Sequence, residues 1–163
     1  MTHSAKQWMA PVPWDSVVTI NRALCQAQNA EPLTNPAGVE TAQRLWDAAV
    51  NRSMTVRDAF DVCRQTHKAG PFVFNNGNTF AAVGHTLAET LLRSLPPVEA
   101  QILRTTIGHY ICGLIGNGEL QQVMKHVEPL LERATPTSAA TTQSPAPTPT
   151  PSVPLGLPRQ QEA

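Results

Sequence analysis

Residues 101–118 read QILRTTIGHYICGLIGNG, and this stretch decides the fold class of the chain. Apolar residues recur in it at steps of three and four, the spacing of one buried face of an α-helix. They are Leu103, Ile107, Tyr110, Ile111 and Leu114. The pattern predicts one amphipathic helix across the whole stretch, stopped by Asn117-Gly118.

The other side of this predicted helix is small and polar. It carries Gln101, Arg104, Thr105, Gly108 and Cys112. A helix that faces only water usually shows Glu and Lys there, whereas Gly and Thr let a neighbour approach the backbone closely. Two interpretations follow. The face either packs against another helix or receives a ligand or a nucleic-acid strand.

Helical periodicity extends on both sides of this stretch. Further helices are predicted at about 14–28, 37–51, 55–67, 79–94 and 119–133. Asp15 or Ser16 can cap the first of these helices, and Ser53 or Thr55 can cap the third. Pro97 can occupy the first turn of the helix over residues 101–118. Pro129 should kink or shorten the last helix. Between the third and fourth helices, Phe72-Val73-Phe74 is a candidate short strand.

These segments predict an all-α fold, an antiparallel four-helix bundle with up to six helical segments. Residues 1–13 form an N-terminal arm, where two prolines exclude a regular helix. The helical core covers 14–133, and 134–163 is a Pro/Thr/Ser-rich tail, expected to be disordered. The apolar island Val153–Leu157 in that tail is either a docking peptide or ordinary tail.

Composition narrows the classes of protein. The chain has 163 residues, 41% of them hydrophobic, with 12 basic and 12 acidic side chains. A net charge of zero argues against purely electrostatic nucleic-acid binding but allows weak binding repeated along a polymer. The three cysteines form no CxxC pair, and no secretory signal or membrane-spanning run is present, so a soluble intracellular protein is expected.

Two patterns that contain histidine are candidates for a metal, pH-sensing or catalytic site. His85 and His109 each follow a glycine on either side of Pro96-Pro97, so they could share a metal, sense pH or simply pack. Cys63 and His67 lie one helical turn apart, which formally allows a catalytic pair but is more often structural. Phosphate- and dinucleotide-binding motifs are absent from the sequence. We therefore expect no enzyme activity, no cofactor and no metal.

Several segments, in order, resemble the coat proteins of rod-shaped plant viruses of the tobamovirus type. The likeness is clearest at Ile102-Leu103-Arg104-Thr105-Thr106-Ile107, followed by Leu114-Ile115 and Gly116-x-Gly118. Weaker pieces precede it, and the set covers roughly residues 14–120. These pieces are Trp14-Asp15, Ile20-Asn21, Arg44-Leu45-Trp46, Thr55-Val56-Arg57 with Phe60, Phe72-Val73-Phe74 and Glu89-Thr90-Leu91-Leu92.

The resemblance implies a structural capsid protein. Such subunits form a four-helix bundle and stack into a helical rod around single-stranded RNA, which lies along the helix that residues 101–118 resemble. Carried over, Val98, Gln101, Arg104 and Thr105 would line the RNA groove, with Arg93 nearby. The partners implied are further copies of the chain and genomic RNA, without a membrane, in the virion and in the host cytoplasm during assembly.

The chain departs from that family in places. The family's phosphate-binding arginines before the RNA-facing helix are reduced here to Arg93, since Ser94-Leu95-Pro96-Pro97 follows directly. Pro97 and Val98 replace acidic residues, and one interface carboxylate falls near His85. A flexuous filamentous coat protein is a close variant, because Ala59–Arg64 resembles that group. A cellular helical adaptor with a docking tail is the alternative from a different class.

Overall fold

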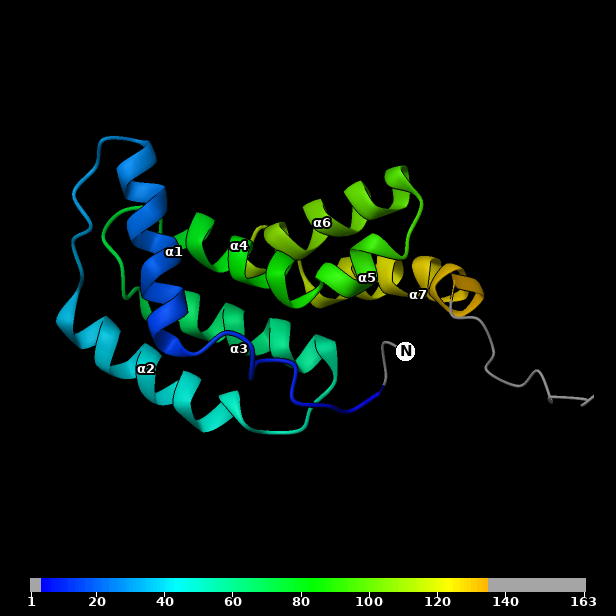
Figure 1. Ribbon diagram of the computed structural model, residues 1–163, viewed down its shortest axis with the longest axis horizontal. Coiled ribbons are helices and arrows are strands. Elements are labelled where there is room, and N and C mark those ends of the chain that lie inside the picture. Colours follow the sequence, from blue (N-terminus) through cyan, green and yellow to red (C-terminus); the bar gives the residue numbers. More distant parts are fainter. Residues whose placement is uncertain (1–3, 135–163) are drawn as a thin grey trace, which may run out of the picture.

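The computed structural model describes residues 4–134 and shows an all-helical chain (Figure 1). The predicted fold class is confirmed. In the described residues there are two isolated β-bridges and no strand. The helices are α1 (Trp14–Ala27), α2 (Pro36–Val50), α3 (Val56–Ala69), α4 (Asn76–Leu87), α5 (Glu89–Arg93), α6 (Pro97–Ile111) and α7 (Asn117–Ala134).

The helix ends follow from local sequence chemistry. Thr55 caps α3, because its hydroxyl accepts the N–H of Asp58 while the Asp58 carboxylate accepts the N–H of Thr55. Gly70 ends α3 in the left-handed conformation, at φ 64°. Pro97 occupies the first turn of α6, as predicted. For α1 the prediction of an Asp15 or Ser16 cap is wrong, since the N-cap is Pro13 without a side-chain hydrogen bond.

Helices α2, α3, α4 and α6 lie side by side, and successive ones run in opposite directions (Figure 1). Helix α4 is central, because α1, α3 and α6 all pack against it. Helix α1 crosses this layer at one end, and α7 packs on α6. The antiparallel bundle therefore has additional helices around it.

The core is built around aromatic side chains from distant parts of the chain. Trp46 is fully buried, with its ring centroid 6.2 Å from those of Trp14 and Phe80. Phe72 stacks on Trp14 at 6.1 Å. Such a cluster joins α1, α2, α4 and the α3–α4 loop, because aromatic side chains bury the largest apolar area per residue.

The N-terminal arm packs against the helical core of the same chain. Met9 and Val12 are buried, and the Val12 carbonyl accepts a 2.8 Å hydrogen bond from Trp46 Nε1. Lys6 and Met54 exchange two backbone hydrogen bonds of 3.0 Å, which fasten the arm to the α2–α3 loop. The arm is thus part of the core packing despite having no helix.

The helix predicted over 101–118 ends earlier than expected, at Ile111. Gly113 adopts φ 77°, its N–H donates to the Tyr110 carbonyl, and the N–H of Leu114 donates to the His109 carbonyl. This pair of bonds is a Schellman motif, which terminates a helix. Consequently Leu114, predicted to be buried, is 71% exposed, and Asn117-Gly118 begins α7 instead of ending α6.

Three other predictions need correction. The helix over 79–94 is divided into α4 and α5 at Ala88, although the Ala88 N–H still donates to the Gly84 carbonyl. The candidate strand 72–74 amounts to a single bridge between Thr34 and Phe72. Of the two effects predicted for Pro129, the shortening is wrong, because α7 continues to Ala134; Pro129 is exposed, so water can satisfy the carbonyl that it leaves unpaired.

Two sequence expectations lie outside the described residues. These are the disordered tail beyond residue 134 and the docking peptide at Val153–Leu157. Within residues 4–134, no helix combines the length and the hydropathy needed to cross a membrane.

Candidate nucleic-acid interface

The outer face of α6 is an exposed strip of neutral side chains. Val98 is 67% exposed and Ile102 44%, and both point away from the core. Gln101 and Thr105 are exposed beside them, and Gln101 Nε2 donates to Thr105 Oγ1 at 3.4 Å. Opposite this strip, α6 buries Leu103, Ile107, Tyr110 and Ile111, which fixes the orientation of the helix.

The predicted polar face of α6 is divided into a part that packs on α4 and a part that stays accessible. A β-carbon built on Gly108 would lie 3.6 Å from the β-carbon of Ala81 and 3.5 Å from His85 Nε2. Cys112 Sγ donates to the Gly77 carbonyl at 3.5 Å. Gly108 and Cys112 therefore pack against α4, and only Gln101, Arg104 and Thr105 of the predicted polar face remain accessible.

The close approach of α4 and α6 also depends on Gly84. A β-carbon there would lie 2.3 Å from Ile111 Cδ1 and 3.0 Å from Ile107 Cγ2, so the space is already filled by α6. Glycines on both helices let the backbones come together. The exposed part of α6 is thereby held against a rigid support.

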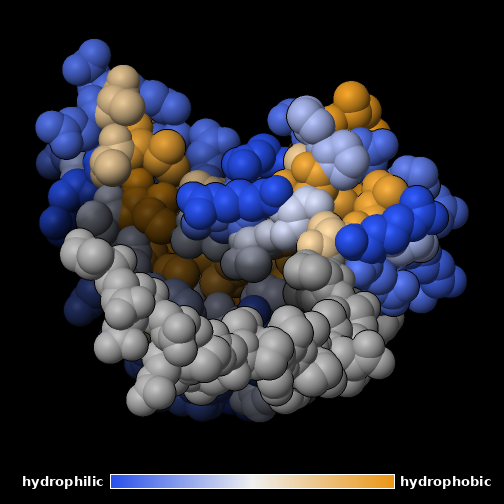
Figure 2. All heavy atoms as spheres, turned by 45° about the vertical axis from the view of Figure 1, so that its right-hand side comes forward, coloured by the Kyte–Doolittle hydropathy of each residue, from blue (hydrophilic) through white to orange (hydrophobic). Residues whose placement is uncertain are grey.

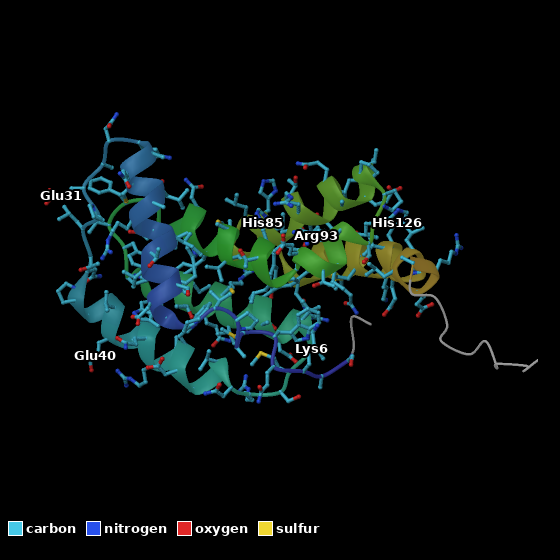
Figure 3. The ribbon with its side chains drawn as sticks, in the orientation of Figure 1. Lys6, Glu31, Glu40, His85, Arg93 and His126 are labelled. Atoms are coloured by element: carbon cyan, nitrogen blue, oxygen red, sulfur yellow. The ribbon has the colours of Figure 1, made fainter. Side chains whose placement is uncertain are left out.

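A shallow hollow adjoins the exposed strip where α4 and α5 meet α6. It has a volume of about 260 Å³ and is lined by Ala82, His85, Thr86, Glu89 and Arg104. Figure 2 shows that the surface is hollowed between the part that contains α1 and the part that contains α6. Figure 3 places His85 and Arg93 along this side of α4 and α5.

The side chain of His85 is held between α4 and α6 by a hydrogen bond. Its Nε2 donates a 2.8 Å hydrogen bond to the main-chain carbonyl of Arg104, because a carbonyl can only accept. Burial lowers the pKa of His85 below the ordinary 6.5, the bond to the carbonyl raises it in part, and the Arg104 charge lowers it again. His85 is therefore mainly neutral at pH 7, with Nδ1 unprotonated.

The two predicted arginines differ in what they contact. Arg93 Nη2 forms a 2.6 Å ion pair with Glu89, one turn earlier, and both side chains are largely exposed. Arg104 is exposed and has no ion-pair partner in residues 4–134. An anion can therefore bind Arg104 without displacing a carboxylate, whereas at Arg93 it would compete with Glu89.

The metal and catalytic alternatives gain no geometric support. Residues 4–134 contain no group of three or more His, Cys, Asp or Glu side chains placed to hold a metal ion. Cys63 is fully buried, and burial raises the pKa of its thiol far above the ordinary value, so the thiolate that catalysis requires does not form at neutral pH.

Sequence reasoning missed two side chains of this surface. Ile102 and His109 are exposed and share the strip with Val98 and Thr105, at helical steps of three and four. The signal was present, because a residue four positions from an exposed one shares its face. Ile102 is exposed although isoleucine usually faces the core, so residue type alone does not mark it as a surface residue.

The fold defines the chain as an all-α helical bundle protein. The exposed face of α6 is neutral and partly apolar, and it lies next to Arg104, which has no ion-pair partner in the described residues. Comparison with known proteins adds nothing to this class: no family model, curated protein or solved structure matches the chain.

The pKa of His85 leads to a testable pH dependence of stability. Because its folded-state pKa is lowered, the folded chain binds this proton more weakly than the unfolded chain, whose histidine titrates near 6.5. The free energy of unfolding should therefore fall as pH drops below about 6.5. His85→Gln keeps a donor for the Arg104 carbonyl and removes the titration.

This variant should show a flatter decline of stability between pH 7.5 and 5 in urea unfolding. Part of the decline should remain, since burial also lowers the pKa of His67. If both proteins lose stability equally over that range, His85 is not linked to folding in this way.

Proposed function

We propose that this chain is a viral coat protein that polymerises into a helical rod and packages single-stranded RNA. The observation that carries the proposal is the exposed face of α6, where Val98, Gln101 and Thr105 lie in the open beside the unpaired Arg104. The resemblance of this helix to the RNA-facing helix of rod-shaped virus coat proteins supports the same assignment.

The chemistry of the face suits weak binding that does not depend on sequence. Its amide and hydroxyl groups can meet base edges or ribose, and Val98 offers an apolar contact to a base. Arg104 can meet a phosphate with two parallel hydrogen bonds. One cation per subunit gives little affinity alone, but identical sites along one strand bind cooperatively.

Arg93 can supply a second phosphate contact. Its ion pair with Glu89 is exposed, and such pairs contribute only about 0–1 kcal/mol, so a phosphate can compete with the carboxylate. The acid beside it limits the gain, because Glu89 also lines the hollow and repels the same phosphate. Arg104 is therefore expected to contribute more than Arg93.

A low net charge agrees with polymerisation. Twelve acidic and twelve basic side chains leave no overall charge, so stacked copies would repel one another little. The side chains that support α6 are buried, which lets the helix present the same face in every copy. Repetition of one rigid surface is what a helical rod around a strand requires.

Negative-stain microscopy of the purified protein, with and without a long single-stranded RNA, tests the proposal. We expect rods or discs near neutral and mildly acidic pH, with RNA inside the rods protected from nuclease. Flexuous filaments would indicate the related filamentous class of coat protein. A protein that stays monomeric or dimeric at high concentration, with or without RNA, would favour a cellular adaptor and overturn the proposal.

Arg104→Ala should weaken RNA binding in a salt-dependent way. Removing one phosphate contact on a single strand lowers the slope of log K against log salt by about 0.7. The measurement is fluorescence anisotropy of a labelled oligonucleotide at several salt concentrations.

Arg44→Ala is the matched control for this variant. Arg44 is likewise an exposed arginine, lies on α2 and pairs with Glu40 at 3.5 Å, and α2 makes no packing contact with α6. Its removal should leave the salt slope unchanged. Equal slopes for the Arg104 variant and the wild type would remove Arg104 from the RNA site.

A further inference from the structure

Five of the six exposed large hydrophobic side chains in residues 4–134 gather at two places, and the sixth, Leu114, lies apart from them in the α6–α7 loop. The first, here called the tip, consists of Leu33, Val73 and Phe74, which are 43%, 54% and 45% exposed. The second, here called the α6 patch, consists of Val98 and Ile102, one helical turn apart. Apolar side chains exposed together at such positions indicate surfaces that another molecule covers.

The tip is rigidly built, although it consists of loops. The N–H of Val73 donates to the Leu33 carbonyl at 3.0 Å, and the N–H of Asn35 donates to the Pro71 carbonyl at 2.9 Å. Asn21 Nδ2 donates to the Phe74 carbonyl at 2.8 Å from inside α1. The three apolar side chains therefore stand on a fixed platform, which lowers the entropy lost when a partner binds.

Glu31 at the tip and Arg104 beside the α6 patch carry opposite charges, and the exposed Lys68 at the end of α3 is a further cation two residues before the 70–75 segment. Glu31 is the one charged residue in the loop segments 28–35 and 70–75, and it is exposed. Arg104 is the exposed charge on the hollow side of the α6 patch, while the half-buried Glu99 lies on its other side. Neither Glu31 nor Arg104 has an ion-pair partner in residues 4–134.

The two surfaces lie at opposite ends of the molecule. In Figure 1 the loops that form the tip are at the left end of the long axis, and α6 begins at the right end. Figure 3 places Glu31 at the tip, and Figure 2 shows hydrophobic atoms at the surface on the α6 side. Two different patches at opposite ends cannot satisfy each other within one copy, but they can between copies.

We propose that the tip of one copy packs against the α6 patch of the next copy, with Glu31 beside Arg104. Contact between two different patches is heterologous, so it does not end at a dimer but repeats, giving a ring where the rotation closes and an open helical polymer where it does not. The inference rests on the proposed function, because it names the surfaces through which a coat protein of this sequence would assemble.

The contact also places the RNA at the boundary between copies. Val98 borders both the α6 patch and the Gln101–Thr105 face, and the five donors of Arg104 can hold a carboxylate on one edge and a phosphate on another. A neighbouring tip would cover the apolar part of α6 and leave its polar part open to the strand.

The test uses three glutamate substitutions at exposed positions of the full-length chain. Val73→Glu disables the tip, Ile102→Glu disables the α6 patch, and Ala48→Glu on the exposed side of α2 is the control. Circular dichroism and the melting temperature establish that each variant folds. If Ile102→Glu fails to fold, Val98→Glu replaces it, since Val98 is more exposed.

Sedimentation velocity without RNA then measures assembly of each protein and of mixtures. The wild type and Ala48→Glu should polymerise, and each patch variant alone should sediment as a monomer. An equimolar mixture of Val73→Glu and Ile102→Glu should form heterodimers and nothing larger, because only one intact tip and one intact α6 patch can meet. That mixture result is particular to a heterologous contact.

Other results overturn the assignment. If Ile102→Glu alone still dimerises while Val73→Glu does not, the tip binds another tip. If both variants polymerise like the wild type, or if the wild type is monomeric, these patches are not the assembly surfaces. RNA binding by the wild type, followed in parallel by anisotropy, separates this inference from the proposed function: a wild type that polymerises through these two patches but binds no RNA would keep the contact and reject the coat protein.

Exchange of the two charges gives a second measurement. Glu31→Arg and Arg104→Glu should each shift polymerisation to a higher protein concentration, and the double variant should recover part of the loss. The recovery should shrink as salt rises, because the pair lies at the edge of the contact. A double variant no better than the single variants would remove this ion pair from the interface.

Discussion

Trp46→Ala should cause the largest loss of stability of any single substitution in the core. The side chain is fully buried between Trp14 and Phe80, and large aromatic-to-alanine changes cost about 3–5 kcal/mol. The change also removes the donor to the Val12 carbonyl and so loosens the N-terminal arm. Since a domain has only about 5–15 kcal/mol of net stability, the variant should be close to unfolding.

Urea unfolding followed by circular dichroism measures this loss. Trp46→Phe is the informative comparison, because it retains a six-membered aromatic ring and loses the five-membered ring together with the hydrogen bond to Val12. Its cost should be clearly smaller than that of alanine. A loss below about 1 kcal/mol for Trp46→Ala would mean that the cluster around it is not the centre of the core.

Gly38→Ala should also destabilise the chain strongly, against the usual preference of helices for alanine. A β-carbon at Gly38 would lie 2.5 Å from the Gly70 carbonyl oxygen and 2.6 Å from that of Ala69. These are main-chain atoms at the end of α3, where Gly70 already has a left-handed conformation, so they cannot move aside as a side chain can. The loss of stability from overpacking, about 1–3 kcal/mol or more, should exceed the stability gained from the higher helix propensity of alanine, about 1 kcal/mol.

Gly118→Ala is the matched control in α7. A β-carbon at Gly118 has no neighbouring atom within 4 Å, so only the gain in helix propensity should remain. Thermal and urea unfolding should show Gly118→Ala equal to or above the wild type, and Gly38→Ala well below it. If both substitutions stabilise the chain, the α2–α3 contact is looser than the distances at Gly38 indicate.

The sequence was sufficient for the fold class and for most helix positions, because apolar residues recur at helical spacing, most clearly in α1, α2, α3 and α7. It also placed Pro97 at the start of α6, and it limited the cap of α3 to Ser53 or Thr55, of which the structure has Thr55. The end of α6 was predicted at the wrong glycine. Asn117-Gly118 looked like the stronger stop signal, yet Gly113 ends the helix, since hydrogen bonding from Gly113 and Leu114 back to α6 decides the matter.

Long-range polar pairs explain the remaining differences in the core. Asn21 is buried on the inner side of α1 with Trp14, Val17 and Cys25, although its side chain is polar. Its side chain donates to the Phe74 carbonyl and to Thr79 Oγ1, residues more than fifty positions away. No periodicity within α1 could reveal partners at that separation.

The candidate site was predictable only in part. Arg104, Gln101 and Thr105 are accessible, as their polarity suggested. The glycine and cysteine of the same face pack on α4, because small residues serve helix contact as readily as ligand approach. The sequence also could not show that Arg93 is paired with Glu89 while Arg104 is free of carboxylates in the described residues.

The placement of the tryptophans has a consequence for spectroscopy. All three belong to the arm, α1 and α2, and all are buried, whereas α5, α6 and α7 contain none. Indole emission therefore reports the aromatic cluster around Trp46 and the arm, whose Trp8 lies beside Thr90 and Leu91 of α5, while circular dichroism reports every helix. If the two signals change together on heating, the chain melts as a single unit; if emission lags, α6 and α7 come apart first.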